Sequence, residues 1–294
     1  MKAAVWALEA LRKSVRPGWR ASGLTCFLKG VLNAFRPRGE RILSNLAMVY
    51  PDRPGAWRKK LRRSLYGHLA WTVTEILALQ RDPAQALDWI REVQGLQYLE
   101  SLQGEKKGAL FVSAHYGNWE LMASWYAQYL KSGRKSRDFY IVSQNMRDRD
   151  LSALVERYRK NTGIKLLPKN TSTLEMVRVL RSGGHIAMLV DISWIGGILL
   201  PFMGHECTHA TGPAVLSLLA SVPVVPISIR REKPFCHVAE FFPPLPVPEN
   251  GDRLDRIAQV TQSISGAVER MIDLRPELWF WLHNRWKKEK AREL

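Results

Sequence analysis

Residues 108–122 read GALFVSAHYGNWELM, and this stretch indicates the fold class. Its first half, residues 108–114, has the length and the β-branched and aromatic content of a buried strand. The turn Tyr116-Gly117-Asn118 follows, with Gly117 to bend on, and Asn118 is the expected N-cap of a helix. A buried strand that turns directly into a helix is a building unit of α/β sheets. We therefore expect His115 at the C-terminal end of a strand, the edge at which open α/β sheets bind ligands.

An imidazole and a carboxylate, those of His115 and Glu120, lie five positions apart across this turn. In a tight turn, Glu120 reaches back from the first helical turn to the ring of His115. It then fixes one ring nitrogen as a donor and leaves the other free to take a proton from a hydroxyl. The pair predicts a general base, His115, oriented by an acid, Glu120. A structural histidine is the alternative, because perturbed pairs also serve structure.

Other catalytic and metal-binding signatures are missing from the sequence. There is no His-Glu-x-x-His, no Gly-x-Ser-x-Gly, no P-loop and no dinucleotide-binding glycine motif. Cys26, Cys207 and Cys236 are far apart and form no Cys-x-x-Cys pair, so neither a disulfide framework nor a zinc site is indicated. We expect no metal and no cofactor, and a reducing cytoplasmic environment.

The composition indicates an anionic partner. Lys and Arg number 44 and Asp and Glu 27, which gives a formal charge of +17. Nucleic acid, an anionic membrane surface and an acidic carrier protein all fit this charge. Eleven tryptophans interleaved with basic residues favour a membrane interface. No zinc-finger, RNP or helix-turn-helix signature is visible, so we expect no nucleic acid, and a nucleic-acid-binding protein is a distant alternative.

The N-terminal residues 1–36 are predicted to form one or two amphipathic helices that lie on a membrane surface. Charged residues interrupt any signal-peptide core, and the most apolar part, residues 21–35, contains Lys29 and is shorter than the roughly 20 residues of a membrane span. An ordinary helical arm packed on the domain is the alternative. No repeat or linker interrupts the remainder, so we expect residues 37–294 to be one domain.

Helical and strand patterns alternate after His115. Strands are expected at 138–143, 164–167, 185–190 and 222–229, helices at 148–162 and 172–181, an antiparallel strand at 237–242 and a long helix at 252–274; an earlier helix spans 56–79. Such alternation predicts an α/β fold with a mixed, largely parallel sheet flanked by helices. Asp191 follows one of these strands, so its carboxylate should lie at the same sheet edge as His115.

Several segments resemble the late acyltransferases of lipid A biosynthesis, bacterial enzymes similar to glycerol-phosphate acyltransferases in their H-x4-D/E motif. The resemblance covers residues 41–287, and its segments are 115–120, 159–163, 181–191, 201–204 with 210–214, 223–226 and 276–287. It implies an acyltransferase that moves a fatty acyl group from acyl carrier protein to a hydroxyl of a lipid A precursor of the Kdo-lipid IVA type. His115 and Glu120 would be catalytic, and Arg159 or backbone N–H groups near Gly117 would stabilise the oxyanion.

The resemblance also implies a substrate site and a location. Its substrate-binding residues would be Arg159, Asp191, Gly117, Asn118, Gly204 and Gly212, with the last two glycines allowing close backbone approach. The protein would sit peripherally on the cytoplasmic face of the bacterial inner membrane. Ile192, Met203 and Asn284 depart from the usual family residues, so other acceptors, such as a lysophospholipid, a glycolipid or an aminolipid, and an acyl-CoA donor remain alternatives.

Overall fold

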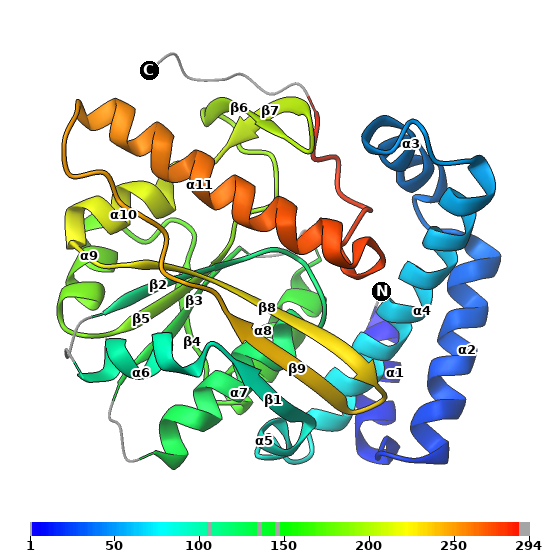
Figure 1. Cartoon of the computed structure of the whole chain (residues 1–294). Helices are drawn as coiled ribbons and strands as arrows, with labels where there is room; N and C mark the ends of the chain where they lie inside the picture. Colours follow the sequence, from blue (N-terminus) through cyan, green and yellow to red (C-terminus); the bar gives the residue numbers. More distant parts are fainter. Residues whose placement is uncertain (1, 105–107, 134–136, 145–147, 288–294) are drawn as a thin grey trace.

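The computed structural model describes residues 2–104, 108–133, 137–144 and 148–287. Within these ranges a seven-stranded sheet has the order β1-β9-β8-β2-β5-β3-β4 (Figure 1). Its strands are β1 (Ile90–Gln94), β2 (Ala109–Ser113), β3 (Phe139–Ser143), β4 (Lys165–Pro168), β5 (His185–Leu189), β8 (Val224–Lys233) and β9 (Cys236–Phe241). Neighbours from β8 to β4 are parallel, whereas β9 runs antiparallel to β8. The predicted mixed, largely parallel sheet is confirmed.

Two features of the strands were not predicted. The edge strand β1 pairs in parallel with β9, and its charged, exposed Arg91 and Glu92 hide the strand pattern. A separate antiparallel hairpin, β6 (Ile198–Phe202) and β7 (His205–His209), occupies the segment expected to be a loop.

Helices cover both faces of the sheet because its strands are apolar on both faces. On β2, Leu110 and Val112 pack toward one side, against the cluster that includes α9 (Thr173–Arg181), α10 (Gly212–Ala220) and α11 (Arg253–Leu274). Phe111 points to the opposite side, which α7 (Trp119–Ser132) covers. The remaining helices of the sheet region are α5 (Gln85–Trp89), α6 (Leu96–Gly104), α8 (Arg149–Asn161) and the short 3-10 helix η1 (Pro276–Leu278).

Four helices precede the sheet: α1 (Lys2–Ser14), α2 (Trp19–Phe35), α3 (Gly39–Val49) and α4 (Gly55–Leu79). They stack along one side of the molecule, with α2 beside α4 (Figure 1). A buried hydrogen bond of 2.9 Å joins Thr25 of α2 to Thr74 of α4. Among the described residues, no helix is both long enough and apolar enough to span a bilayer. The helical prediction for residues 1–36 is confirmed where the chain is described, while their membrane association stays a prediction.

Candidate active site

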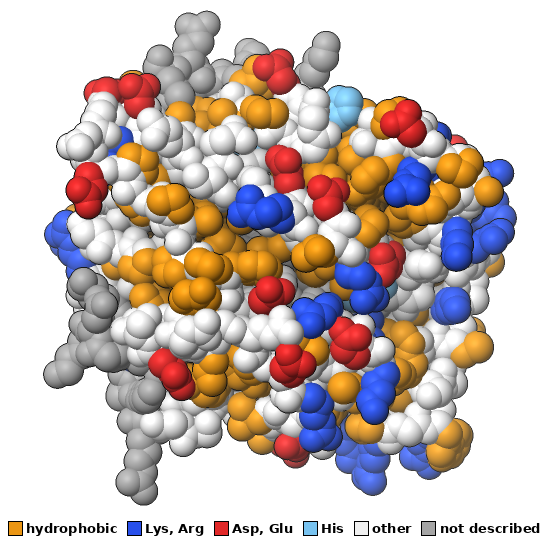
Figure 2. Space-filling view, in the orientation of Figure 1, with side chains coloured by type: hydrophobic (Ala, Val, Ile, Leu, Met, Phe, Trp, Pro, Cys, Tyr) orange, Lys and Arg blue, Asp and Glu red, His pale blue; other side chains and the backbone are white. Residues whose placement is uncertain are grey.

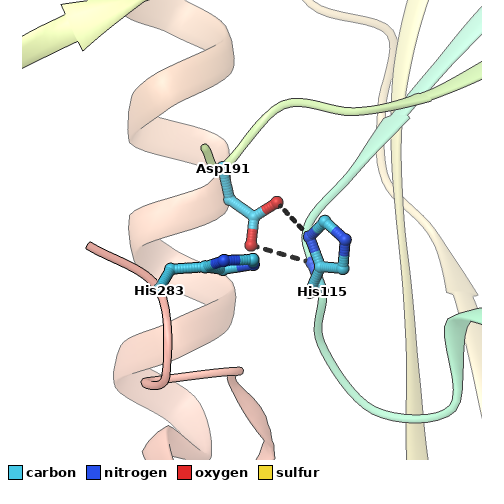
Figure 3. Close-up of side chains that lie close together, drawn as sticks. All are labelled: His115, Asp191 and His283. Atoms are coloured by element: carbon cyan, nitrogen blue, oxygen red, sulfur yellow. Dashed lines mark hydrogen bonds and ion pairs between the residues drawn. The ribbon is translucent and has the colours of Figure 1, made fainter. Parts of the chain in front are cut away.

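His115 and Asp191 meet at the C-terminal edge of the sheet. They follow the neighbouring parallel strands β2 and β5, in which Ser113 lies opposite Leu189. The Nδ1 of His115 is 2.8 Å from the Oδ1 of Asp191, and the backbone N–H of His115 donates to Oδ2 at 2.9 Å (Figure 3). With the carboxylate accepting from Nδ1, Nε2 is the ring nitrogen left to accept a proton in the neutral imidazole. The predicted meeting of these two residues at one sheet edge is confirmed.

The Asp191 carboxylate is fully buried and is held in its charged form. Burial alone raises the pKa of this carboxyl, but the charge and hydrogen bonds of His115 outweigh burial and hold the pKa below its usual range. The indole N–H of Trp279 also donates to Oδ2 at 2.8 Å. The oxygens of Asp191 are thus engaged by His115 and Trp279, and the carboxylate orients the imidazole; the predicted substrate-binding role of Asp191 stays a prediction.

The segment after α11 holds the His115 turn in place. Gly117 donates its backbone N–H to the carbonyl of Leu278, and Phe280 donates to the carbonyl of His115. Trp279 forms an isolated β-bridge with Tyr116 and is fully buried. No local sequence signal could have revealed this role, because these contacts join residues more than 160 positions apart.

His283 lies beside His115. Its ring centroid is 4.7 Å from that of His115, at an interplanar angle of 72° (Figure 3). Neither ring nitrogen hydrogen-bonds to a described residue, and Nε2 is buried. Burial lowers the pKa of His283 to about 4, and the effect of His115 in the same direction is opposed by Asp191. His283 is therefore neutral near pH 7.

Glu120 contacts Arg159, and the predicted contact with His115 is wrong. Its two carboxylate oxygens accept from Arg159 at 3.0 and 2.5 Å, and the indole N–H of Trp119 donates to one of them at 3.2 Å. Burial alone lowers the pKa of Arg159, but Glu120 outweighs it and raises that pKa. The physical reason is the strand order: β5 brings Asp191 beside His115, while α8 brings Arg159 to Glu120.

The residues of the turn after His115 contact other parts of the protein and hold the turn in its conformation. Gly117 has a φ of 60°, and a side chain there would overlap the carbonyl oxygen of Ile229. Its N–H donates to the carbonyl of Leu278, and the N–H of Tyr116 donates to that of Ala114, so neither of these two backbone donors is free in this structure. Asn118 was predicted to bind substrate. It is fully buried, and its side-chain oxygen accepts from the N–H of Leu121 as the helix N-cap.

A buried polar network between α4 and β8 supports this turn. The amide of Asn118 donates to Glu75 at 2.8 Å, and Arg231 donates to both Glu75 oxygens. Arg231 also donates to Nδ1 of His68, so Nε2 of His68 carries the proton that it donates to the carbonyl of Gly117 at 3.1 Å. Burial and the Arg231 charge lower the pKa of His68 to about 3. Burial raises the pKa of Glu75, yet the neighbouring His237 and Arg231 lower it to about 2.

Neither of the two glycines predicted to allow close backbone approach has a close protein neighbour. No atom lies within 4 Å of the position that a Cβ would occupy on Gly204 or Gly212. Gly204 has a φ of 78° in the turn between β6 and β7, so turn geometry explains it. Gly212 begins α10. A substrate-binding role for either residue stays a prediction.

An apolar pocket opens beside His115. It lies between α7 and the sheet, with Trp119, Glu120 and Arg159 in its lining. Trp119 packs edge-on against His115 with centroids 5.1 Å apart. The other lining residues are mainly aliphatic and aromatic, and include Phe111, Tyr126, Phe139, Ala187, Ile227 and Phe241. An apolar lining of this kind suits a hydrocarbon chain.

Within the described residues, three side chains offer metal-ligand atoms close together: those of His115, Asp191 and His283 lie within 4.8 Å of one another. The sequence analysis found no such cluster because the three residues come from separate segments. The Nδ1 of His115 and Oδ1 of Asp191 already hydrogen-bond to each other, so an ion here would replace that bond.

Comparison with known proteins identifies the family of the chain. A family model described as "Bacterial lipid A biosynthesis acyltransferase" matches residues 16–288. The lipid A biosynthesis lauroyltransferase of Escherichia coli K12 is 22% identical over 262 residues, which cover 88% of this chain and 82% of that protein. A phosphatidylinositol mannoside acyltransferase of Mycobacterium tuberculosis is 24% identical over 256 residues, 84% of this chain and 77% of that protein.

Proposed function

Because the chain belongs to the bacterial lipid A biosynthesis acyltransferase family, we propose that this acyltransferase moves a fatty acyl group from acyl carrier protein to a hydroxyl of a lipid A precursor. The observation that carries the proposal is the His115–Asp191 pair, whose imidazole packs against Trp119, a residue that lines an apolar pocket. A base beside a hydrocarbon pocket combines the two requirements of acyl transfer to an alcohol.

In the proposed reaction, the Nε2 of His115 takes the proton of the acceptor hydroxyl. The hydroxyl oxygen attacks the thioester carbonyl carbon directly, and Asp191 stabilises the imidazolium that forms. The tetrahedral intermediate then collapses: the carbon–sulfur bond breaks, and the imidazolium returns the proton to the leaving thiolate. No covalent acyl-enzyme is required.

Arg159 is our proposed oxyanion donor, and Glu120 acts by holding it. The Nε and Nη2 of Arg159 are engaged by Glu120, whereas Nη1 makes no hydrogen bond to a described residue. This nitrogen belongs to a guanidinium that lines the pocket beside the base. Stabilisation of the developing negative charge typically contributes more to catalysis than any other single effect. Glu120 thus remains a proposed member of the catalytic machinery, through Arg159 and not through His115.

The apolar pocket is proposed to bind the acyl chain of the donor. Phe111, Tyr126, Phe139 and Phe241 pack with centroid distances of 4.9 to 6.3 Å and form its aromatic side. Burial of each methylene contributes about 0.8 kcal/mol. The position of this aromatic group would then determine which chain length fits.

The basic surface supports acidic partners at the cytoplasmic face of the inner membrane. Lys and Arg gather, with hydrophobic side chains among them, on the side formed by the N-terminal helices (Figure 2). On α2, Trp19, Phe27 and Phe35 are 79%, 66% and 82% exposed. Exposed aromatics beside basic residues suit peripheral attachment to anionic lipid. Acyl carrier protein is acidic and would be drawn to the same charge.

Reconstituted acyl transfer tests the proposal. Purified protein is incubated with dodecanoyl-acyl carrier protein and Kdo-lipid IVA, and the lipid is analysed by mass spectrometry. We expect a product heavier by one dodecanoyl group. Parallel reactions with phosphatidylinositol mannoside, a lysophospholipid and an aminolipid test the alternative acceptors, and dodecanoyl-CoA tests the donor. Acylation of one of these with none of Kdo-lipid IVA would overturn the proposed acceptor.

A further inference from the structure

Arginines surround a hollow at the turn between α2 and α3, which we call the arginine hollow. It is lined by Arg36, Arg38, Gly39, Glu40 and Arg41. The three arginines are exposed, and none forms an ion pair with a carboxylate among the residues that the structure describes. Glu40, also exposed, is the acidic member of the lining. The hollow therefore carries an excess of positive charge that the described protein does not neutralise.

Arg62 of α4 adds a buried cation beneath this hollow. Its side chain is only 7% exposed, and its Nε is buried without a hydrogen-bond partner. Its Nη1 lies 3.4 Å from the position that a Cβ would occupy on Gly39, so the guanidinium points at the hollow's lining. The described residues supply Arg62 with no ion pair and no hydrogen bond. Without such a partner among the described residues, this guanidinium is available to an anion in the hollow.

The N-terminus of α3 also favours an anion in the hollow. This helix has 11 residues, and no side chain caps its first turn. The N–H groups of Gly39 and Ile42 bond to the carbonyls of Arg36 and Arg38. In the described chain no acceptor is found for the N–H groups of Glu40 and Arg41. Free N–H groups and the positive end of the helix dipole favour an anion.

The arginine hollow is connected directly to the active site. Arg38 donates from Nη1 to the carbonyl of Leu282 at 3.0 Å. From α3, the amide of Asn45 donates to the carbonyls of Trp281 and His283, each at 3.0 Å. The ring of His283 in turn packs against His115. A ligand held in the hollow would therefore lie on the same C-terminal segment that lines the base.

We infer that the arginine hollow binds a phosphate group of the acceptor lipid while the hydroxyl of that lipid approaches His115. The inference rests on the proposed function for the identity of the acceptor, but not for the phosphate chemistry. Arginine guanidinium groups match phosphate oxygens in paired hydrogen bonds, and a helix N-terminus adds backbone donors. A phosphate fixed beside the C-terminal segment selects an anionic glycolipid or phospholipid over a neutral one.

Direct binding tests the phosphate chemistry without turnover. The full-length protein is titrated with dodecylmaltoside micelles containing phosphatidic acid, or containing diacylglycerol as the neutral match, and tryptophan fluorescence is followed. We expect tighter binding of phosphatidic acid, and a loss of about 10- to 100-fold in that affinity for Arg38→Gln and Arg62→Gln. Glu40→Gln should strengthen binding, because it removes the acidic group of the hollow.

Arg63→Gln is the matched control. It removes the same charge from the adjacent, exposed position of α4 and should change affinity less than about threefold. An equal loss in Arg63→Gln, or no loss in Arg38→Gln and Arg62→Gln, would overturn the inference. Thermal melting checks the fold of Arg62→Gln; if that variant unfolds, Arg36→Gln at the exposed position decides in its place. Inorganic phosphate that binds as tightly as phosphatidic acid would assign the hollow to a free anion and overturn the lipid part.

A kinetic readout separates acceptor from donor. In acyl transfer to Kdo-lipid IVA, Arg38→Gln should raise the KM of the acceptor about 10- to 100-fold with little change in the KM of dodecanoyl-acyl carrier protein. A rise in the donor KM alone would assign the hollow to the carrier protein and overturn the inference. If the wild-type protein does not acylate Kdo-lipid IVA, the proposed function fails, while the micelle titration still decides the phosphate site.

Discussion

Among single residues, Asp191 fixes the orientation of His115, the proposed base. Its carboxylate oxygens take the Nδ1–H and the backbone N–H of His115 and the indole N–H of Trp279. This arrangement fixes the ring, the tautomer and the position of Nε2. Glu120 neutralises a different group, the Arg159 guanidinium. The two carboxylates near the site therefore have separate tasks, and substitutions should separate them.

Asp191→Asn should lower kcat by about 10²- to 10⁴-fold, because the amide no longer favours Nδ1 as donor or stabilises the imidazolium. The measurement is the pH profile of kcat in the acyl-transfer assay, compared with Glu120→Gln. The first variant should change the shape of the profile, since it alters the base itself. The second should lower kcat with the profile's shape preserved. Identical profiles for wild type and Asp191→Asn would contradict the orienting role.

The sequence was sufficient to locate His115 and Asp191 but not to pair them. The rule that ligands meet at the carboxyl ends of parallel strands brought both residues to one edge. Proximity along the chain favoured Glu120 as the partner of His115. The correct choice depends on β5 lying next to β2 and on α8 carrying Arg159 to Glu120, and both are long-range facts that no local pattern contains.

Among the helices and strands, α4 supports the catalytic turn through the neutral His68. His68 has a pKa of about 3 in the folded protein, against 6.5 for an ordinary histidine. Below pH 6.5 the His68 side chain is protonated in the unfolded chain, whereas in the folded chain it stays neutral until about pH 3. Protonation therefore favours unfolding, and stability should fall as pH drops through this window.

His68→Gln should reduce this pH dependence. Gln has both a donor for the Gly117 carbonyl and an acceptor for Arg231, but it does not titrate. Urea unfolding between about pH 7 and pH 5 should show an average slope smaller than that of the wild type by about 1 kcal/mol per pH unit. A variant with the wild-type slope would show that His68 does not contribute a neutral imidazole to the fold.

The elements around the pocket predict its chain-length selectivity. Ala187 of β5 pairs with Phe111 of β2, and both residues line the pocket. Ala187→Val and then Ala187→Phe should fill the pocket stepwise, and each lost methylene of donor contact removes about 0.8 kcal/mol. Competition among acyl carrier proteins with 8-, 12- and 16-carbon chains measures the preference. It should move toward shorter chains in both variants, and most in Ala187→Phe.

For the molecule as a whole, the exposed aromatics of α2 and the basic N-terminal side predict peripheral membrane binding. Trp19→Ser and Phe27→Ser should each weaken binding to vesicles of phosphatidylethanolamine and phosphatidylglycerol by about tenfold, in proportion to the apolar area removed. Leu174→Ser, at a 59% exposed position on α9, is the control and should bind like wild type. Co-sedimentation with these vesicles at rising salt measures the apolar and the electrostatic contributions to binding. Binding unaffected by the α2 changes would contradict the prediction.

The overall architecture was largely predictable because alternating helix and strand patterns follow from local periodicity. The C-terminal segment was not, since the aromatic and basic composition around Trp279, Trp281 and Arg285 does not indicate what these residues contact. In the structure they are buried in irregular backbone against the His115 turn and β7. Their role follows from contacts with distant segments, and aromatic or basic composition alone does not distinguish a buried brace from a membrane anchor.

The proposal that His115 is the general base of acyl transfer is best tested by single-turnover formation of acylated Kdo-lipid IVA, with wild type and His115→Ala compared. Mass spectrometry follows the product at saturating dodecanoyl-acyl carrier protein. We expect a rate lower by about 10²- to 10⁴-fold in His115→Ala, with wild-type thermal stability. A folded His115→Ala protein that forms product at a rate near that of wild type would contradict the proposed mechanism.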